Sequence, residues 1–155
     1  LNSEKLDLGI KYYREYYSTK GLYENIIYEG IEKLLNELFL SHKSLYLVTV
    51  KPHVFAKEIL DHFGLERYFL SIYGSDLSSL NKTKEELIGN LIRDKKLSAD
   101  KTVMVGDRKH DILGAKYNKI KSIAVTYGYG SMKELRDSFP NYMVHNINEL
   151  TDLLR

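Results

Sequence analysis

Apolar residues along this chain follow two periods, one typical of strands and one typical of helices. Short runs rich in Val, Ile, Leu and Tyr predict strands at residues 44–50, 69–73, 102–105, 122–125 and 142–144. Apolar positions three or four residues apart predict helices at residues 3–18, 29–41, 52–63, 84–95, 131–138 and 147–154, with a further helix opening near residue 111. Strands that alternate with helices at this spacing indicate an α/β protein built on a doubly wound parallel sheet.

Residues 101–115, with the sequence KTVMVGDRKHDILGA, are the stretch around which this fold is organised. The apolar run 102–105 predicts a strand buried on both faces, and Gly106 ends it. Asp107 and Asp111 then open a helix, at the strand end where open α/β sheets bind their ligands. Two carboxylates in this position suit a hard divalent cation such as Mg²⁺. A simpler alternative is that Asp107 caps the helix and Asp111 is a solvated acid in its first turn. The helix is expected to bury its apolar positions, Ile112, Leu113 and Ala115.

Two other side chains occupy strand ends or helix starts. Thr49 ends the apolar run 44–50, where a hydroxyl and the N–H groups of the following turn can hold a phosphoryl oxygen. Lys84 is the first residue of the helix predicted at residues 84–95, and its ammonium could bridge a phosphate and the two carboxylates. Taken alone, Thr49 also fits an ordinary strand residue and Lys84 a solvated surface lysine. Lys82 competes with Lys84 for the same role.

Composition narrows the class of protein. The 155 residues are 43% hydrophobic and 28% charged, as in an ordinary globular domain. The 23 Lys and Arg are scattered among 21 acids for a net charge of +2, so nucleic acid is not an expected partner. No cysteine is present, which excludes disulfides and thiolate metal sites. Strand-sized apolar runs predict no membrane association, and we expect a cytoplasmic protein. Because the chain does not begin with Met, we expect that residue 1 is not its natural start.

Three segments in order carry a family resemblance: VTVKP, KEELI and VMVGDRKHDILGA. Together they resemble the second, third and fourth motifs of the haloacid dehalogenase (HAD) superfamily, in its phosphoglycolate phosphatase-like branch, which has a Rossmann-like core. The resemblance implies a phosphatase that hydrolyses monoesters of small phosphorylated metabolites through an aspartyl-phosphate. Thr49 and the backbone N–H of Val50 would bind the phosphoryl group, and Lys84 would stabilise its charge. Asp107 and Asp111 would bind Mg²⁺.

The resemblance also implies that part of the family's fold is missing. Residues 1–21 resemble the last helix of a helical cap and its linker, and residues 22–155 a core without its first, central strand. That strand carries an Asp-x-Asp-Gly motif with the nucleophile, and no Asp-x-Asp occurs in this chain. We therefore expect a gap of two strand spacings, roughly 9–10 Å, between the strands that end near Thr49 and Val105. A separate N-terminal segment or a second chain would fill it, and the chain alone would be inactive.

Two other functions are compatible with parts of the sequence. A non-catalytic remnant of the family, acting as an interaction or regulatory domain, would explain the absent nucleophile. A signalling receiver domain also combines a doubly wound sheet with acids, a Thr and a Lys-Pro, but it places its acids before the hydroxyl. Here Thr49 and Lys51-Pro52 come first, which disfavours a receiver.

Overall fold

The computed structural model describes residues 3–76 and 82–155, and all strands within these residues are parallel. The strands are β1 (Tyr46–Pro52), β2 (Ser71–Ser75), β3 (Val103–Gly106), β4 (Lys121–Val125) and β5 (Tyr142–Val144). The helices are α1 (Ser3–Tyr16), α2 (Ile31–Leu40), α3 (His53–His62), α4 (Lys84–Lys95), α5 (Lys109–Tyr117), α6 (Met132–Asp137) and α7 (Ile147–Leu154). A π-helical turn, η1 (Tyr17–Gly21), continues α1, and short 3-10 turns lie at Glu66–Tyr68 and Ala99–Lys101. This is the α/β architecture predicted from the alternation of strands and helices.

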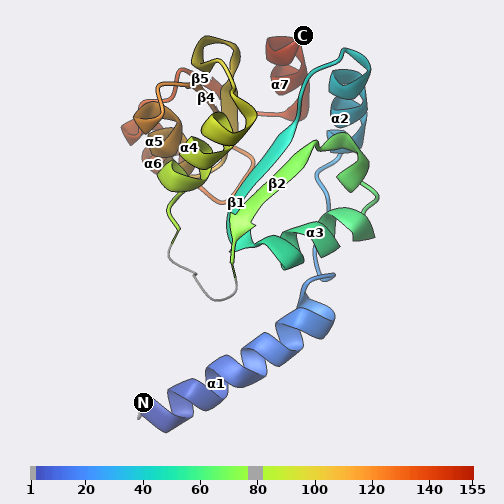
Figure 1. Ribbon diagram of the computed structural model, residues 1–155, viewed down its shortest axis with the longest axis vertical. Coiled ribbons are helices and arrows are strands. Elements are labelled where there is room, and N and C mark those ends of the chain that lie inside the picture. The colour runs from blue at the N-terminus through green and yellow to red at the C-terminus, as the bar shows by residue number, and fades with distance from the viewer. Residues whose placement is uncertain (1–2, 77–81) are drawn as a thin grey trace.

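Helices cover both faces of the strands (Figure 1). On one face, Leu34 of α2 and Leu150 of α7 pack with Ile123 of β4, and α3 joins α2 through a second cluster that contains Leu35 and Leu60. On the other face, α4 and α5 pack against β1 and β3. Because successive side chains of a strand point to opposite faces, β1, with Leu47 and Val48, and β4, with Ile123 and Ala124, contribute to the clusters on both faces.

The strands form two separate sheets, one of β1 and β2 and one in the order β3-β4-β5. No strand pairs with the second edge of β1 or of β3 in the described part of the chain. The sheet is thus interrupted between these two strands, and the alternative that they close up and pair directly is wrong, whereas the missing central strand stays a prediction. Helices α4 and α5 bridge the interruption, since Val48 of β1 and Met104 of β3 belong to one apolar cluster with them.

Two burial predictions fail in the stretch around β3. The strand was expected to be buried on both faces, but Val103 is 37% and Val105 36% exposed. An edge strand lacks the side chains of one neighbour, which would otherwise shelter these two valines. Leu113 was expected in the core with Ile112 and Ala115, but it is 41% exposed whereas the other two are fully buried. A step of 100° per residue turns it away from the sheet.

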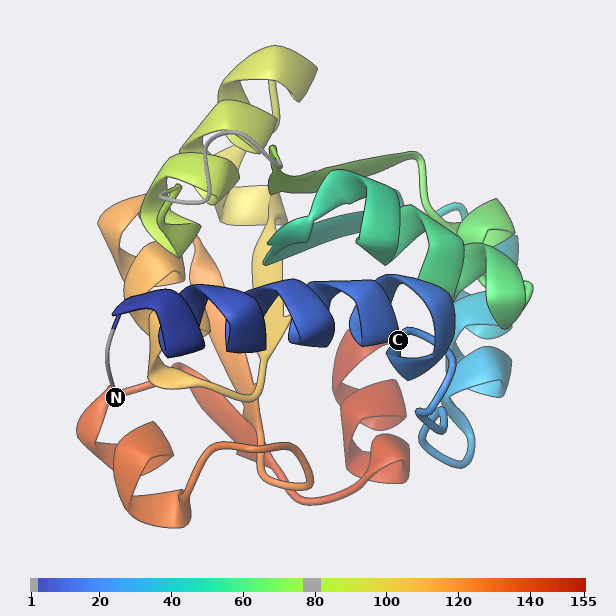
Figure 2. The same ribbon diagram turned by 90° about the horizontal axis from the view of Figure 1, so that it is seen from below.

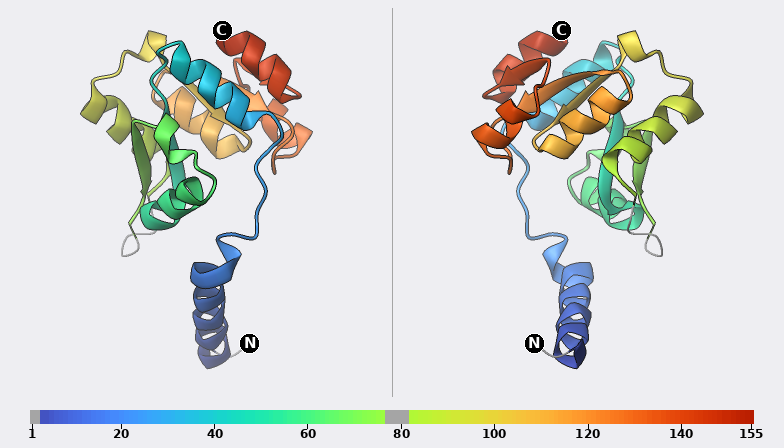
Figure 3. Two further views of the ribbon diagram at one scale, coloured as in Figure 1. Left: turned by 90° about the vertical axis from the view of Figure 1, so that its right-hand side faces the viewer. Right: turned by 90° about the vertical axis from the view of Figure 1, so that its left-hand side faces the viewer.

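Helix α1 stands apart from the body. It is joined to α2 by an irregular segment and lies beyond the ends of β1 and β2 (Figures 1 and 3). Seen from below, it crosses that side of the molecule (Figure 2). Three of its large side chains, Leu6, Tyr12 and Tyr13, are more than half exposed. The part of the chain that the structure describes contains no helix long and apolar enough to span a lipid bilayer.

Candidate active site

Lys84 joins the end of β1 to the start of α5. A capping box fixes the first turn of α4: Thr83 Oγ1 accepts a hydrogen bond from Glu86 N at 3.3 Å, and Thr83 N donates to Glu86 Oε2 at 2.8 Å. From this turn the Lys84 ammonium donates to the carbonyl oxygen of Val48 at 2.5 Å. It also forms an ion pair with Asp111 Oδ1 at 2.9 Å, with only 12% and 7% of the two side chains exposed. The alternative that Lys84 is a solvated surface lysine is therefore wrong.

Asp111 is held in the interior at the first turn of α5. Its Oδ2 accepts a hydrogen bond from Arg108 N at 3.1 Å, while Oδ1 binds Lys84. A Cβ on Gly106 would collide with the Asp111 carboxyl group, so the end of β3 must be glycine for the carboxylate to fit. Asp111 is 5% exposed and is not the solvated acid of the simpler alternative.

Asp107 lies on the loop between β3 and α5, under the turn that follows β4. Tyr129 N donates a hydrogen bond to Asp107 Oδ2 at 2.7 Å. The alternative that Asp107 caps the helix is wrong, because Arg108 occupies that position. The neighbours of Tyr129, Gly128 and Gly130, have no room for a side chain: a Cβ on either would overlap Asp107. The two glycines in the sequence YGYG thus let the turn close over this carboxylate.

A methyl group at Gly128 should displace Asp107. We expect Gly128→Ala to destabilise the protein by about 1–3 kcal/mol, because the new Cβ overpacks against the aspartate. Thermal unfolding of the variant measures the loss. The matched control is Gly9→Ala in α1, where no atom lies within 4 Å of the added Cβ and a helical alanine is favourable. Equal stability of Gly128→Ala and the parent would contradict the close contact.

The remaining predicted site residues lie at the carboxyl end of β1 and before α4. Thr49 is half-buried and follows Val48, whose carbonyl binds Lys84; its Oγ1 accepts a hydrogen bond from Lys51 N at 3.1 Å. Val50 is 54% exposed at the same strand end. Lys82, the rival of Lys84, instead pairs with Asp76 at 3.0 Å and keeps 38% of its side chain exposed. Of the two lysines, only Lys84 contacts both the backbone of β1, at Val48, and the carboxylate of Asp111.

The donor set can be compared with the needs of a cation. Mg²⁺ commonly binds a protein through one or two carboxylates and takes its other oxygens from water and phosphate. Asp107 and Asp111, from one loop and the next helical turn, match that requirement, although each also accepts a backbone hydrogen bond. The described residues include no group of three or more His, Cys, Asp or Glu placed to hold a metal ion. Within the described residues, Asp107 and Asp111 stay the predicted metal-binding candidates.

Tyr28 is a neighbour of the site that the sequence did not single out. Its ring meets that of Tyr127 edge-on, with 5.3 Å between centroids. Burial and then the nearby charge of Asp107 raise the pKa of Tyr28, and burial raises that of Tyr127 to about 12. Both stay neutral hydroxyl donors at physiological pH. In the sequence, Tyr28 falls in the segment between the helices predicted at residues 3–18 and 29–41. Its one signal there is that it is an aromatic residue two positions before Gly30.

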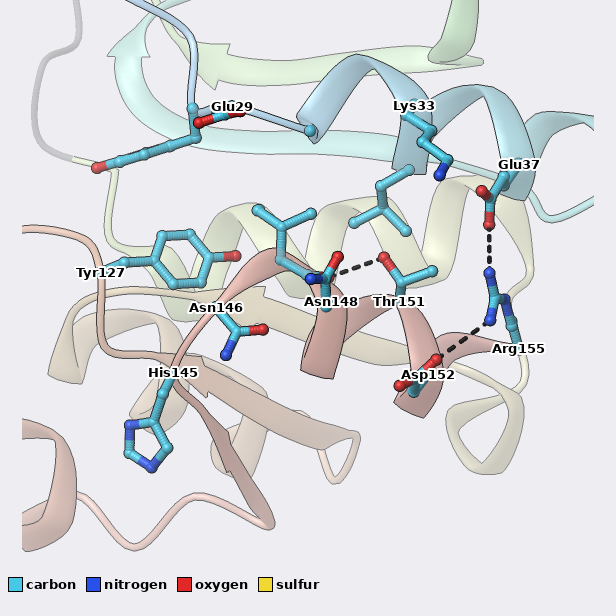
Figure 4. A pocket seen from close by; sticks show the side chains of 14 residues that line it. Glu29, Lys33, Glu37, Tyr127, His145, Asn146, Asn148, Thr151, Asp152 and Arg155 are labelled. Atoms are coloured by element: carbon cyan, nitrogen blue, oxygen red, sulfur yellow. Dashed lines mark hydrogen bonds and ion pairs between the residues drawn. The ribbon is translucent and has the colours of Figure 1, made fainter.

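The same two tyrosines line one end of a cavity of about 720 Å³ between α2 and α7 (Figure 4). At its other end, Arg155 Nη2 binds Glu37 Oε2 at 3.1 Å. Neither Lys84 nor Asp111 lines this cavity, so it is separate from the ion pair described above.

Parallel strands, helices on both faces and polar side chains collected at strand ends define a doubly wound α/β protein with its site at the carboxyl edge of the sheets. More narrowly, the chain belongs to the haloacid dehalogenase-like hydrolase family, whose model matches residues 2–125. The resemblance predicted from three short motifs is confirmed.

Named relatives and solved structures extend this finding. A Pseudomonas aeruginosa protein named 5'-nucleotidase is 43% identical over 94% of this chain and 66% of its own length. A Vibrio parahaemolyticus protein named phosphoglycolate phosphatase is 30% identical over 94% of this chain and 64% of its own length. A candidate phosphatase from Clostridium difficile, solved by crystallography, has a TM-score of 0.97 and 42% identity, covering 100% of this chain and 73% of that one. The chain thus spans slightly less than two thirds of both curated relatives.

Proposed function

We propose that this chain is the larger part of a Mg²⁺-dependent phosphatase that hydrolyses monoesters of small phosphorylated metabolites. The observation that carries the proposal is the buried Lys84, whose ammonium links the strand end beside Thr49 to the carboxylate of Asp111. A cation held between a hydroxyl-bearing strand and a buried carboxylate suits the charge of a phosphate that is being transferred. The names of the relatives support the same class of reaction.

Each residue has a defined role in this proposal. The Thr49 hydroxyl and the Val50 N–H donate to phosphoryl oxygens, and the Lys84 ammonium neutralises the charge that develops on the group in transfer. Asp107 and Asp111 would hold Mg²⁺, which supplies Lewis-acid stabilisation of the phosphoryl oxygens when bound. The loop 127–130 keeps the Asp107 carboxylate in place through Tyr129 N.

The nucleophile is the part that this chain does not contain. We propose that a further parallel strand fills the interruption between β1 and β3 and brings a carboxylate to the same edge. That carboxylate would attack phosphorus and release the alcohol, and water would then cleave the phosphoaspartate to free phosphate. The exposed Val103 and the unpaired edges of β1 and β3 support an apolar strand as the occupant. We use the term "complete protein" for this chain together with such a strand.

We expect the chain alone to be inactive toward an aryl phosphate and the complete protein to be active in Mg²⁺. The test is to assay the 155-residue chain, then the same chain joined to a strand-forming segment that ends in Asp-x-Asp-Gly. The matched control is that fusion with its first Asp changed to Asn, which keeps the strand and removes the nucleophile. Mg²⁺-dependent turnover by the chain alone would refute the need for an added strand.

The substrate can be identified with a panel of esters. Nucleoside 5'-monophosphates and phosphoglycolate, the chemical classes in the names of the relatives, belong in that panel with sugar phosphates. Loss of turnover after chelation by EDTA, and recovery with Mg²⁺ alone, tests the metal. Activity that survives chelation would overturn the metal-dependent part of the proposal.

A further inference from the structure

The π-helical turn after α1 is seated against the carboxyl end of β1 and the start of α3. Tyr17, the first residue of η1, packs edge-on against Phe55 of α3, with 5.7 Å between ring centroids. The Lys51 ammonium lies 4.7 Å from the centre of the Tyr17 ring, within the range of a cation–π interaction. It also donates a hydrogen bond to the Tyr17 hydroxyl. Helix α1, which otherwise stands apart from the body, is thus connected to it beside the candidate active site (Figure 1).

Lys51 also orients Thr49 through its backbone. Lys51 N donates to Thr49 Oγ1 at 3.1 Å. A threonine hydroxyl that accepts a hydrogen bond keeps its own hydrogen for another acceptor, so this bond leaves Thr49 able to donate to a phosphoryl oxygen. The end of β1 lies close against β2, because a Cβ on Gly74 of β2 would lie only 2.9 Å from the Lys51 carbonyl oxygen. Lys51 therefore contacts Tyr17, at the end of α1, with its side chain and Thr49 with its backbone N–H.

We infer that Lys51 is a positioning residue that couples the placement of α1 to the orientation of the Thr49 hydroxyl. π-helical turns inside helices frequently occur at functional sites, and η1 places the Tyr17 ring and hydroxyl over Lys51 at the end of α1. When Tyr17 and Lys51 are in contact, the helix is held across the strand ends and the end of β1 that carries Thr49 is fixed in place. When the contact between Tyr17 and Lys51 is broken, neither the position of α1 nor the orientation of the Thr49 hydroxyl is fixed by it. The kinetic consequence rests on the proposed phosphatase function, whereas the structural consequence does not.

The structural test uses spin labels, which the absence of native cysteine makes specific. Labels at Lys11→Cys in α1 and Lys43→Cys beyond α2, both exposed, report the distance from α1 to the body. We expect a narrow distance distribution in the parent, a broad one in Lys51→Met and Tyr17→Phe, and no change in Tyr12→Phe on the same helix. Lys51→Arg, which keeps a cationic donor, should restore a narrow distribution. Equal widths in the parent and in Lys51→Met would overturn the coupling.

The kinetic test uses the complete protein. Loss of one hydrogen bond should lower kcat/KM roughly three- to tenfold in Tyr17→Phe, with a similar or larger loss in Lys51→Met. The double variant should be no slower than Lys51→Met, because both changes break one contact. Multiplicative losses would show that the two residues act independently and would overturn the inference. If the parent complete protein hydrolyses no phosphate ester, the proposed function fails, and the label distances still decide the coupling.

Discussion

Asp107→Asn should abolish Mg²⁺-dependent turnover of an aryl phosphate by the complete protein while the fold stays intact. The neutral amide cannot contribute the anionic oxygen that Mg²⁺ prefers. The loss should exceed the roughly 10–100-fold change in metal affinity or activity caused by removing only an outer-shell partner of a ligand. The amide oxygen can still accept from Tyr129 N, so the turn over residue 107 keeps its hydrogen bond. Initial rates across a Mg²⁺ titration, together with thermal unfolding, measure both effects.

Asp61→Asn is a suitable control for this experiment. It makes the same chemical change on α3, where Asp61 pairs with Lys57 at 3.0 Å and about half of its side chain is exposed. Exposed pairs contribute little to stability, so this variant should match the parent in both rate and unfolding temperature. If Asp107→Asn retains parental turnover at every Mg²⁺ concentration, Asp107 is not a metal ligand in this protein.

Lys84→Met should cost both activity and stability. Removal of one donor that stabilises transition-state charge lowers kcat by about 10²–10³-fold in other enzymes, and we expect a loss of that size here. Because Lys84 and Asp111 are nearly buried, the substitution also leaves a carboxylate without its cation. Breaking such a pair typically costs about 3–5 kcal/mol. Denaturant unfolding and steady-state rates on the same preparation measure the two losses.

Two further variants separate the roles of Lys84. Lys82→Met changes a lysine two positions away that pairs with the exposed Asp76, and it should alter stability by about 1 kcal/mol or less with activity preserved. Lys84→Met combined with Asp111→Leu removes both charges of the buried pair and should recover much of the stability without recovering activity. If Lys82→Met proves to be the inactive variant, the assignment of the phosphate-binding lysine is wrong.

Local signals explain why many elements were predicted closely. The predicted helix at residues 84–95 coincides with α4, because its start is encoded by the capping box between Thr83 and Glu86. The end of α3 was predicted at Gly64, which adopts the left-handed conformation with φ of +65°. Ser131 caps α6 as expected, since its side chain accepts from Glu134 N. In each case the determining residues lie within one turn of each other.

Other features depended on neighbours distant in the sequence. The pattern of residues 102–105 is that of a strand buried on both faces, yet Val103 and Val105 are partly exposed because, among the described residues, β3 has a neighbouring strand on one edge only. Nothing near Lys51 in the chain indicates Tyr17, which comes 34 residues earlier. The sequence favoured Lys84 over Lys82 for the phosphate-binding role, which stays a prediction; only the tertiary structure shows that the Lys84 ammonium reaches the carbonyl of Val48 whereas Lys82 pairs with Asp76.

The sequence by itself determined the α/β class, the limits of most helices and strands, and the residue types of a phosphate and cation site. Periodicity and caps are local, so they can be read from a few consecutive residues. Only the tertiary structure decided which of those residues meet. It brought Lys84 to Asp111, left β1 and β3 unpaired with each other in the described residues, and connected Tyr17 to the end of β1 near Thr49. Contacts of this kind depend on how distant elements pack. The stability of a buried ion pair, or of a strand within a sheet, is set by neighbouring residues that no short stretch of sequence specifies.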